Sequence, residues 1–281
     1  MKKILVTGSG GYIGRHVVKL LLDKGYEVIA ADLRNDDVDA RAIKVNVSVF
    51  TDVEDPYAYF GKPDICIHLA WRNGFVHQAD SHISDLSAHF VFLKKLIDSG
   101  ISGLAVMGTM HEVGYWEGAI DENTPCKPLS LYGIAKNTLR EALLRCVEGT
   151  QTKLYWLRAY YILGDDFRNH SIFSKIMTMA QEGKKTFPFT SGKNLYDFIT
   201  VDELAQLIVA SVMQDKYTGV INVSTGIPKS LGAQVEEFIA KNGLDIAPEY
   251  GAFPDRPYDS PGVWGNAEKI QKILSEVGVT L

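Results

Sequence analysis

The stretch "VTGSGGYIG", residues 6–14, constrains the fold more than any other part of the chain. The apolar residues 4–6 predict a short buried strand before it, and residues 12–24 have the spacing of a helix. Three regularly spaced glycines lie between the predicted strand and the predicted helix or at its start: Gly8, Gly11 and Gly14. A turn without side chains lets a phosphate approach backbone amides at the positive end of a helix. The stretch therefore predicts a phosphate- or dinucleotide-binding turn.

The spacing of these glycines excludes two common phosphate-binding loops. A Walker-type loop has Lys-Ser or Lys-Thr after its last glycine, whereas Arg15 follows Gly14 here. The dehydrogenase pattern GxGxxG, counted from Gly8, needs a glycine at position 13, where the sequence has Ile13. The pattern that remains is TGxxGxxG, which begins at Thr7.

An acidic residue follows at the distance that a dinucleotide site requires. Asp32 lies 18 residues after Gly14, at the end of the second predicted strand. Its carboxylate can accept hydrogen bonds from both hydroxyls of the adenosine ribose, and it would repel a 2′-phosphate, which favours NAD(H). Arg34, two residues further, could pair with a 2′-phosphate, so NADP(H) stays open.

Apolar strand-like runs alternate with amphipathic helical stretches through the first half of the chain. The runs are "KKILVTG", "YEVIAAD", "AIKVNV", "PDICIHLAW", "SGLAVMGT" and "TKLYWLRAYYI". Helical spacing separates most of them, as in residues 81–98 and 131–148. This alternation predicts an α/β fold, a Rossmann-type doubly wound parallel sheet.

The alternation fades after residue 164, although "YDFITV" and "GVINVS" still read as strands. We therefore expect two lobes, with the chain passing between them more than once. The expected bounds are 1–160 for a dinucleotide-binding domain, which residues 195–223 rejoin, and 161–194 with 224–281 for a smaller α/β substrate lobe.

The composition is that of an ordinary globular protein, 46% hydrophobic and 22% charged, with a net charge of −5. Lysines and arginines are scattered rather than clustered, which favours neither a nucleic-acid nor a membrane partner. The three cysteines form no CxxC pair, so we expect reduced thiols. No apolar stretch approaches transmembrane length. These features predict a soluble, cytoplasmic protein.

A second pattern, "SLYGIAKNTLRE", places Tyr132 and Lys136 at the start of a predicted helix. Residues four apart share a helical face, so the phenol and the ammonium can both face one cofactor. A neighbouring cation is expected to lower the pKa of the tyrosine from its ordinary value of about 10. Upstream, Thr109 ends a predicted strand, and its hydroxyl could hydrogen-bond a substrate oxygen.

Together these motifs resemble the extended short-chain dehydrogenase/reductase family, in its NAD-dependent epimerase/dehydratase branch that acts on nucleotide sugars. The resemblance covers nearly the whole chain. "LYGIAK" is similar to the family's catalytic helix, "LRAYYILG" to its LRxxNVYG strand and "NLYDFITVDELA" to its RDFIHVDDVA segment. "PDRPYD" is similar to its late arginine segment.

The resemblance implies roles for particular residues. Tyr132 would be the general acid or base, Lys136 would hold the nicotinamide ribose, and Thr109 would orient the substrate oxygen. The implied cofactor contacts are Gly8, Gly11, Tyr12, Ile13, Gly14, Asp32, Leu33, Arg34, Asn46, Val47, Leu69, Ala70, Trp71, Tyr132, Lys136 and Tyr160. The implied substrate contacts are Trp71, Thr109, Met110, His111, Tyr161 and Arg256, which would grip the diphosphate of the sugar nucleotide.

The sequence departs from the family pattern at two tyrosines and after the threonine. Tyr161 stands where LRxxN has asparagine, and Tyr196 stands where an arginine commonly precedes Asp-Phe, so the nucleotide base stays open. The 4,6-dehydratases have Asp-Glu directly after the threonine, whereas Met110 and His111 stand there in this chain. Elimination of water therefore lacks its acid and base. His111 could serve as a second acid or as a sugar contact.

The implied reaction is hydride transfer between the nicotinamide and C4 of a hexose. A reductase of a nucleotide-linked 4-keto-6-deoxyhexose is favoured. The stretch "GTMHEVGYWEG" is more similar to the GTxxEYG of such reductases than to the SSxxVYG of UDP-galactose 4-epimerases, and the chain is short. Several aromatic residues would also suit a deoxy sugar: Trp71, Trp116, Tyr160 and Tyr161.

Two alternatives stay open. A 4-epimerase would oxidise the sugar, turn the ketone over and reduce its other face, keeping NAD bound throughout. A non-catalytic cofactor-binding sensor would usually lack one member of the tyrosine–lysine pair, and both members are present here.

The histidines and the amphipathic helices raise two further questions. His82 and His89, seven residues apart on one predicted helix, suggest a metal site, but no third ligand recurs at matching spacing, and we expect no metal. Residues 81–98 and 131–148 resemble the two helices with which the family builds a four-helix dimer interface. We expect a homodimer, with a monomer as the alternative.

Overall fold

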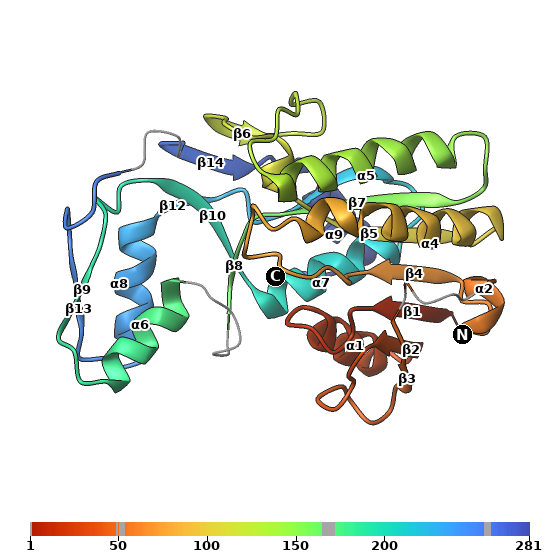
Figure 1. Cartoon of the computed structure of the whole chain (residues 1–281), viewed down its shortest axis with the longest axis horizontal. Helices are drawn as coiled ribbons and strands as arrows, with labels where there is room; N and C mark the ends of the chain where they lie inside the picture. The colour runs from red at the N-terminus through yellow and green to blue at the C-terminus, as the bar shows by residue number, and fades with distance from the viewer. Residues whose placement is uncertain (1, 49, 51–53, 165–171, 256–259) are drawn as a thin grey trace.

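A seven-stranded parallel sheet forms the larger part of the molecule (Figure 1). The computed structural model describes residues 2–48, 50, 54–164, 172–255 and 260–281. The strand order is β3-β2-β1-β4-β5-β7-β11, which reverses direction between β1 and β4 as in doubly wound sheets. The strands are β1 (Lys3–Thr7), β2 (Glu27–Asp32), β3 (Ile43–Asn46), β4 (Ile65–His68), β5 (Gly103–Thr109), β7 (Lys153–Ala159) and β11 (Gly219–Val223). The predicted Rossmann-type fold is confirmed.

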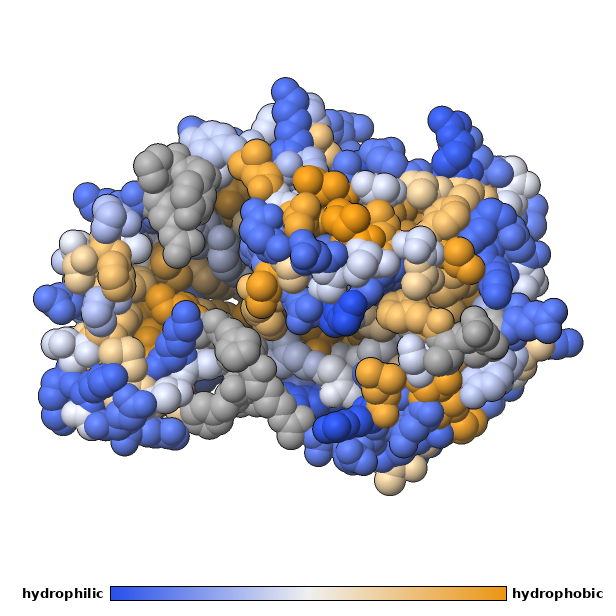
Figure 2. All heavy atoms as spheres, viewed as in Figure 1, coloured by the Kyte–Doolittle hydropathy of each residue, from blue (hydrophilic) through white to orange (hydrophobic). Residues whose placement is uncertain are grey.

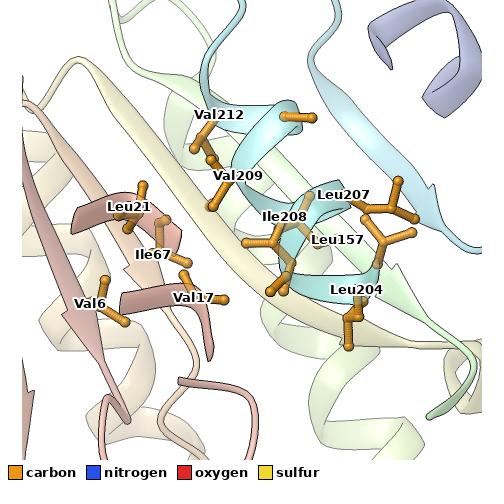
Figure 3. Close-up of a cluster of buried hydrophobic side chains, with 14 of the residues drawn as sticks. Val6, Val17, Leu21, Ile67, Leu157, Leu204, Leu207, Ile208, Val209 and Val212 are labelled. Atoms are coloured by element: carbon orange, nitrogen blue, oxygen red, sulfur yellow. The ribbon is translucent and has the colours of Figure 1, made fainter. Parts of the chain in front are cut away.

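Helices cover both faces of this sheet. On one face lie α1 (Gly14–Asp23), α7 (Val201–Val212) and α9 (Glu268–Val277). Figure 3 shows the valines and leucines of α1 and α7 packed against β1, β4 and β7. On the other face lie α2 (Pro56–Tyr59), α4 (Leu86–Asp98) and α5 (Leu131–Val147). Because both faces are covered, a central strand such as β5 is buried along its whole length.

Residues 81–98, expected as one helix, form two. α3 (Ser81–Ser84) ends at Asp85, and α4 begins directly after it. The Asp85 carboxylate pairs with the Arg72 guanidinium and accepts a hydrogen bond from the Ser84 hydroxyl at 3.2 Å. Short polar side chains of this kind compete with the helical backbone for hydrogen bonds, which hydrophobic spacing does not register. Among the helices in the described part of the chain, none combines the length and apolarity needed to cross a membrane.

A smaller group of elements stands beside the carboxyl edge of the large sheet, on the left of Figure 1. Two helices, α6 (Ile172–Gln181) and α8 (Leu231–Lys241), share an apolar cluster that includes Phe173 and Val235. The remaining strands are β6 (Gly118–Ile120), β8 (Tyr161–Leu163), β9 (Thr186–Pro188), β10 (Leu195–Thr200), β12 (Pro228–Ser230), β13 (Ala247–Glu249) and β14 (Gly262–Gly265).

Residues 195–223 divide between the two groups. β11 pairs with β7 in the large sheet, whereas β10, expected in the same sheet, pairs with β8, β12 and β14. The buried carboxylate of Asp197 on β10 accepts backbone N–H groups of Thr225, Gly226 and Gly265, at 2.8 to 3.2 Å, and so fixes β10 beside β14. The lobe bounds stay a prediction.

Candidate functional site

A cavity of about 900 Å³ lies where the carboxyl ends of the central strands face the smaller group of elements. Gly8 follows β1, Leu69 follows β4, Thr109 ends β5 and Tyr160 follows β7, and all four line the cavity. In open α/β sheets this edge, next to the point where strand order reverses, is where ligands bind. The fold therefore places the candidate site here.

Most of the residues implied by the sequence meet in this cavity. The lining includes Gly8, Gly11, Tyr12, Ile13, Gly14, Leu69, Trp71, Thr109, His111, Tyr132, Lys136, Tyr160 and Tyr161. Seven others are described but lie outside the lining: Asp32, Leu33, Arg34, Asn46, Val47, Ala70 and Met110. Arg256 lies outside the described residues.

The glycine loop, residues 8–14, closes so tightly that three of its four glycines leave no space for a Cβ. Gly8 has a φ of +69°, and a Cβ on it would lie 2.5 Å from the backbone nitrogen of Ala70. A Cβ on Gly14 would lie 2.1 Å from the carbonyl oxygen of Gly8. Gly10, which the motif TGxxGxxG leaves unspecified, would meet the carbonyl oxygen of Arg34 at 2.1 Å. The loop leaves bare backbone at the N-terminus of α1, a cradle that fits a diphosphate.

Asp32 ends β2 directly beside this loop. One of its carboxylate oxygens accepts the N–H of Gly10 at 3.0 Å, and the other accepts the backbone N–H of the next residue at 2.6 Å. The Ser9 hydroxyl donates to the Asn35 side chain at 2.6 Å, and that amide donates to the Asn46 side chain at 2.9 Å. A continuous hydrogen-bond chain thus joins the loop to β3, at the end of the site where the sequence predicts the adenosine.

Tyr132 is placed by the first turn of α5. The Ser130 hydroxyl caps the helix by accepting the N–H of Gly133 at 3.1 Å. Gly133 lets this turn close on the short helix η1 (Met110–Glu112), because a Cβ there would lie 2.3 Å from the carbonyl oxygen of His111. In this position the Tyr132 hydroxyl faces the Thr109 side chain, whose hydrogen-bonding effect lowers the pKa of the phenol.

The ionisation of Tyr132 differs from the expectation. Burial raises its pKa above the ordinary value, and the negative charge of Glu112 raises it further, while the Thr109 hydrogen bond acts in the opposite direction. The expected lowering by Lys136 is wrong for this structure. Burial dominates, and the Lys136 ammonium donates to the Met107 carbonyl oxygen at 2.8 Å rather than to the phenol.

Lys136 is held against an aromatic face. Its ammonium nitrogen lies 3.7 Å from the ring centre of Trp71, a cation–π contact, and the residue is 2% exposed. Burial lowers the pKa of Lys136 to about 7, against a smaller opposing effect of Glu112. A buried ammonium with few polar neighbours can exchange them readily for hydroxyls of a ligand.

Trp71 is fixed by two histidines. Its ring stacks on His89 at 4.3 Å and 20°, and its indole N–H donates to His82 Nδ1 at 3.0 Å. Because Nδ1 of His82 accepts, Nε2 carries the proton and donates to the Val76 carbonyl oxygen at 3.0 Å. His89 Nδ1 is in turn hydrogen-bonded to His68 Nε2 at 2.9 Å.

These imidazoles serve packing and hydrogen bonding within the protein. Burial lowers the pKa of His89 to about 3 and that of His68 well below its ordinary value, so both are neutral near pH 7. Within the described ranges no three His, Cys, Asp or Glu side chains are grouped as a metal ion would require.

His77 is a cavity residue that the sequence did not indicate as a ligand contact. Its ring stacks on Tyr132 at 5.4 Å and 15° and lies 4.3 Å from the ring of His111. Its carbonyl oxygen also accepts the backbone N–H of Tyr132 at 3.0 Å. Burial lowers the pKa of His77 and lowers that of His111 to about 4. Two neutral imidazoles therefore face the cavity beside the Tyr132 phenol.

The opposite side of the cavity is aromatic. We call it the aromatic wall: Tyr160, Tyr161, Phe173, Phe187, Phe189, Tyr196 and Phe198. Tyr161 and Tyr196, the two departures from the family pattern, stack on each other at 4.2 Å and 30° because β8 and β10 pair. Trp116, expected near the pocket, lies outside the lining, and Met110 packs into the apolar cluster of the smaller group.

The fold and the site show the class of this protein. It is a Rossmann-type protein whose glycine loop and tyrosine–lysine pair border one cavity. A family model, the NAD dependent epimerase/dehydratase family, matches residues 4–224, and the chain belongs to this family. A dTDP-6-deoxy-L-talose 4-dehydrogenase (NAD(+)) of Aggregatibacter actinomycetemcomitans is 43% identical over 93% of this chain and 98% of its own.

Solved structures share the fold at low sequence identity. A UDP-N-acetylglucosamine 4-epimerase from Methanobrevibacter ruminantium M1 superposes with a TM-score of 0.84 at 20% identity, over 97% of this chain and 91% of its own. A UDP-glucuronic acid 4-epimerase from Bacillus cereus, in complex with UDP-glucuronic acid and NAD, superposes with a TM-score of 0.81 at 19% identity, over 99% of this chain and 94% of its own.

Proposed function

We propose that this chain is an NAD(H)-dependent oxidoreductase that acts at C4 of a nucleotide-activated sugar. Its reaction would be the reduction of a nucleotide-linked 4-keto-6-deoxyhexose, with Tyr132 as the proton donor. The observation that carries the proposal is that Tyr132, Thr109 and Lys136 line one cavity with the glycine loop. The name of the 43% identical relative supports a 6-deoxyhexose on thymidine diphosphate as the substrate class.

The residues present fit NAD(H). The glycine loop would hold the diphosphate at the N-terminus of α1, because Gly8 and Gly14 have no space for a Cβ and leave bare backbone there. Asp32 would accept the adenosine ribose hydroxyls. Lys136 would hold the nicotinamide ribose by moving its hydrogen bonds from the Met107 carbonyl oxygen to the ribose hydroxyls. A 2′-phosphate next to Asp32 would be repelled, although Arg34 keeps NADP(H) open as a second cofactor.

The chain supplies the proton and the orientation of the sugar. When bound, the reduced nicotinamide supplies the hydride that adds to the C4 carbonyl carbon. The Tyr132 hydroxyl gives its proton to the carbonyl oxygen, so that a C4 alcohol is released, and Thr109 would hydrogen-bond the same oxygen. A raised pKa keeps Tyr132 protonated, which is the form that a proton donor needs. Oxidation of the alcohol is the reverse, with the proton returning to Tyr132.

A 4-epimerase is the second candidate. A UDP-arabinose 4-epimerase of Arabidopsis thaliana is 24% identical over 97% of this chain, which favours the same position on the sugar with a different outcome. Both outcomes use one proton-transfer group and one cofactor. They differ in whether the cofactor leaves after each turnover.

Mass spectrometry of gently purified protein separates the two candidates. A reductase is expected to be isolated without stoichiometric cofactor and to consume one NADH for each dTDP-4-keto-6-deoxyhexose reduced. A tightly retained dinucleotide, together with C4 inversion of a nucleotide sugar without net NADH consumption, would establish the epimerase instead. Protein that binds NADH yet turns over neither substrate class would contradict both candidates.

We also propose a homodimer through α4 and α5. Apolar side chains gather on the face of the molecule over these helices in Figure 2. Val91 on α4 is 48% exposed and Ile134 on α5 is 41% exposed. Light scattering is expected to give the mass of two chains for the wild type and of one chain for Val91→Glu with Ile134→Glu. A wild type with the mass of one chain would contradict the dimer.

A further inference from the structure

We propose that Glu112 is a positioning residue of this site, whose buried carboxylate fixes the end of β5 so that the Thr109 hydroxyl meets the Tyr132 hydroxyl. The inference deepens the proposed function and rests on it for its kinetic readout. Its structural basis is a set of contacts made by the side chain of Glu112, a residue to which the sequence motifs give no role in binding a ligand.

The Glu112 side chain reaches back to the strand end that precedes it. Its Oε1 accepts the backbone N–H of Thr109 at 2.7 Å, while the Thr109 side chain accepts the N–H of His111 at 3.3 Å. This reciprocal arrangement is a capping box, here built on a single helical turn. It ties the backbone and the side chain of Thr109 to η1, and so sets the direction of the hydroxyl that faces Tyr132.

The Glu112 carboxylate is itself held by side chains of β7 and α5. The Trp156 indole N–H donates to both Glu112 oxygens, at 2.9 and 3.0 Å. The guanidinium groups of Arg158 and Arg140 lie 3.4 and 3.7 Å from Oε2. Both Glu112 and Arg158 are fully buried. A carboxylate fixed by one indole and two guanidiniums has little freedom to rotate away from the strand.

The strand makes room for this carboxylate at one residue. Gly108 lines the cavity, and a Cβ on it would lie 2.6 Å from Glu112 Oε1 and 2.2 Å from the Trp156 indole nitrogen. A side chain at this position would therefore push the carboxylate off the strand end. The glycine, the carboxylate and the tryptophan form one packed unit directly below the proposed reaction site.

The same charge also acts on the ionisable groups of the site. Glu112 raises the pKa of Tyr132 and opposes the lowering of the Lys136 pKa. Groups that face Tyr132 come from four neighbouring elements and its own helix: Thr109, His111, Glu112, Trp71, His77, His82 and Lys136. Groups that face Glu112 are Arg140, Trp156 and Arg158, and Cys126 accepts hydrogen bonds from both arginines.

Two substitutions separate the charge of Glu112 from its reach. Glu112→Gln keeps the length and removes the charge, so the Tyr132 phenol becomes more acidic. The alkaline limb of kcat/KM for reduction should then move to lower pH by roughly half to one unit. Glu112→Asp keeps the charge but is too short to reach the Thr109 N–H, so kcat should fall roughly tenfold while the alkaline limb stays in place. In both variants NADH affinity, measured by fluorescence, should stay within about twofold of wild type, since Glu112 does not line the cavity.

Glu141→Gln is the matched control, because Glu141 pairs with Arg140 from the exposed side of α5 and should change neither quantity. Because the positioning role rests on the reach of the side chain, Glu112→Asp decides it, and a folded Glu112→Asp with the wild-type kcat would overturn the inference. A folded Glu112→Gln with the wild-type alkaline limb would contradict the effect of the charge.

A readout without turnover keeps the inference separate from the proposed function. The Thr109 amide of ¹⁵N-labelled protein, which donates to a buried carboxylate, is expected to change its proton shift strongly in Glu112→Asp and little in Glu141→Gln. If no nucleotide sugar is turned over but this amide responds, the proposed function fails and the positioning role stands. An unchanged amide in Glu112→Asp overturns the positioning role.

Discussion

The glycine loop and the aromatic wall border one cavity, yet they are built in opposite ways. The loop is a single run of seven residues in which Gly8, Gly10 and Gly14 leave no space for a Cβ. The wall is assembled from side chains of β8, α6, β9 and β10, brought together by pairing and packing across the chain. The loop offers backbone to a ligand, and the wall offers ring faces. The comparison teaches that the loop is dictated by local spacing, while the wall, where we propose that the sugar nucleotide binds, depends on exchangeable side chains.

The largest effect on binding is expected from filling the loop. Gly14→Ala would place a methyl group 2.1 Å from the carbonyl oxygen of Gly8, so the loop must open. Overpacking of this kind costs about 1–3 kcal/mol, and NADH affinity should fall by roughly 5- to 160-fold if the loop must close again around the cofactor. The matched control is Gly74→Ala, where a Cβ meets no atom within 4 Å although Gly74 lines the same cavity. If a fluorescence titration gave both variants the same NADH affinity, the tight packing of the loop would not matter for cofactor binding, and the distinction between loop and wall would fail.

A smaller effect, on substrate rather than cofactor, is expected at the wall. Tyr161→Asn and Tyr196→Arg restore the residues of the family pattern and each removes one half of the stacked pair. The KM for the sugar nucleotide should change roughly tenfold, with kcat within about threefold and NADH affinity unchanged, because these rings bind without taking part in proton transfer. The double variant should show less than the sum of the two effects, since the rings touch. A loss of kcat with unchanged KM would show that the wall residues take part in the chemical step.

Cofactor choice should respond to a single side chain. Asp32→Ala removes the acceptor for the ribose hydroxyls and the charge that repels a 2′-phosphate, so NADH affinity should fall by roughly fivefold to tenfold while NADPH affinity stays level or rises. Titrating both cofactors into wild type and variant measures the preference directly. An unchanged preference would show that the ribose does not reach Asp32.

The last effect is on stability rather than binding and concerns the buried histidines behind Trp71. Because His68 and His89 are neutral in the fold while their unfolded pKa is about 6.5, the unfolded chain binds more protons below that pH. The free energy of unfolding should therefore fall as pH drops from about 6.5 toward 3, by up to about 1.4 kcal/mol per pH unit for each histidine. His89→Phe should flatten this slope. Denaturant unfolding curves at several pH values measure the free energy of unfolding. If its slope against pH is the same in His89→Phe as in the wild type, the assignment of a neutral buried His89 is wrong.

Local sequence pattern predicted the glycine loop and the elements around it. The strands, α1 and the glycine spacing follow from hydrophobic period and backbone geometry within 30 residues, so local pattern was sufficient. Tyr132 and Thr109 were expected in one site, and their proximity follows from the cap at Ser130 and the close approach at Gly133.

Other features could not be predicted, because they depend on contacts between distant segments. The carboxylate of Asp197 accepts backbone N–H groups from the segment after β11 and from β14, and hydrophobic pattern cannot register contacts between such distant segments. The raised pKa of Tyr132 depends on burial, a property of the finished fold. His77 lies in a loop without periodicity. Gly10 could have been found, because "GSGGYIG" contains four glycines and the motif TGxxGxxG uses only three of them.

The central claim is that Tyr132 exchanges a proton with the sugar oxygen at C4. The most direct measurement is the initial rate of NADH formation from dTDP-6-deoxy-L-talose and NAD⁺, compared between wild type and Tyr132→Phe at equal cofactor saturation. The wild type should form one NADH for each sugar oxidised, and Tyr132→Phe should lose roughly 10²- to 10⁴-fold in kcat while binding NADH as tightly. A Tyr132→Phe variant that turns over at the wild-type rate would contradict the account.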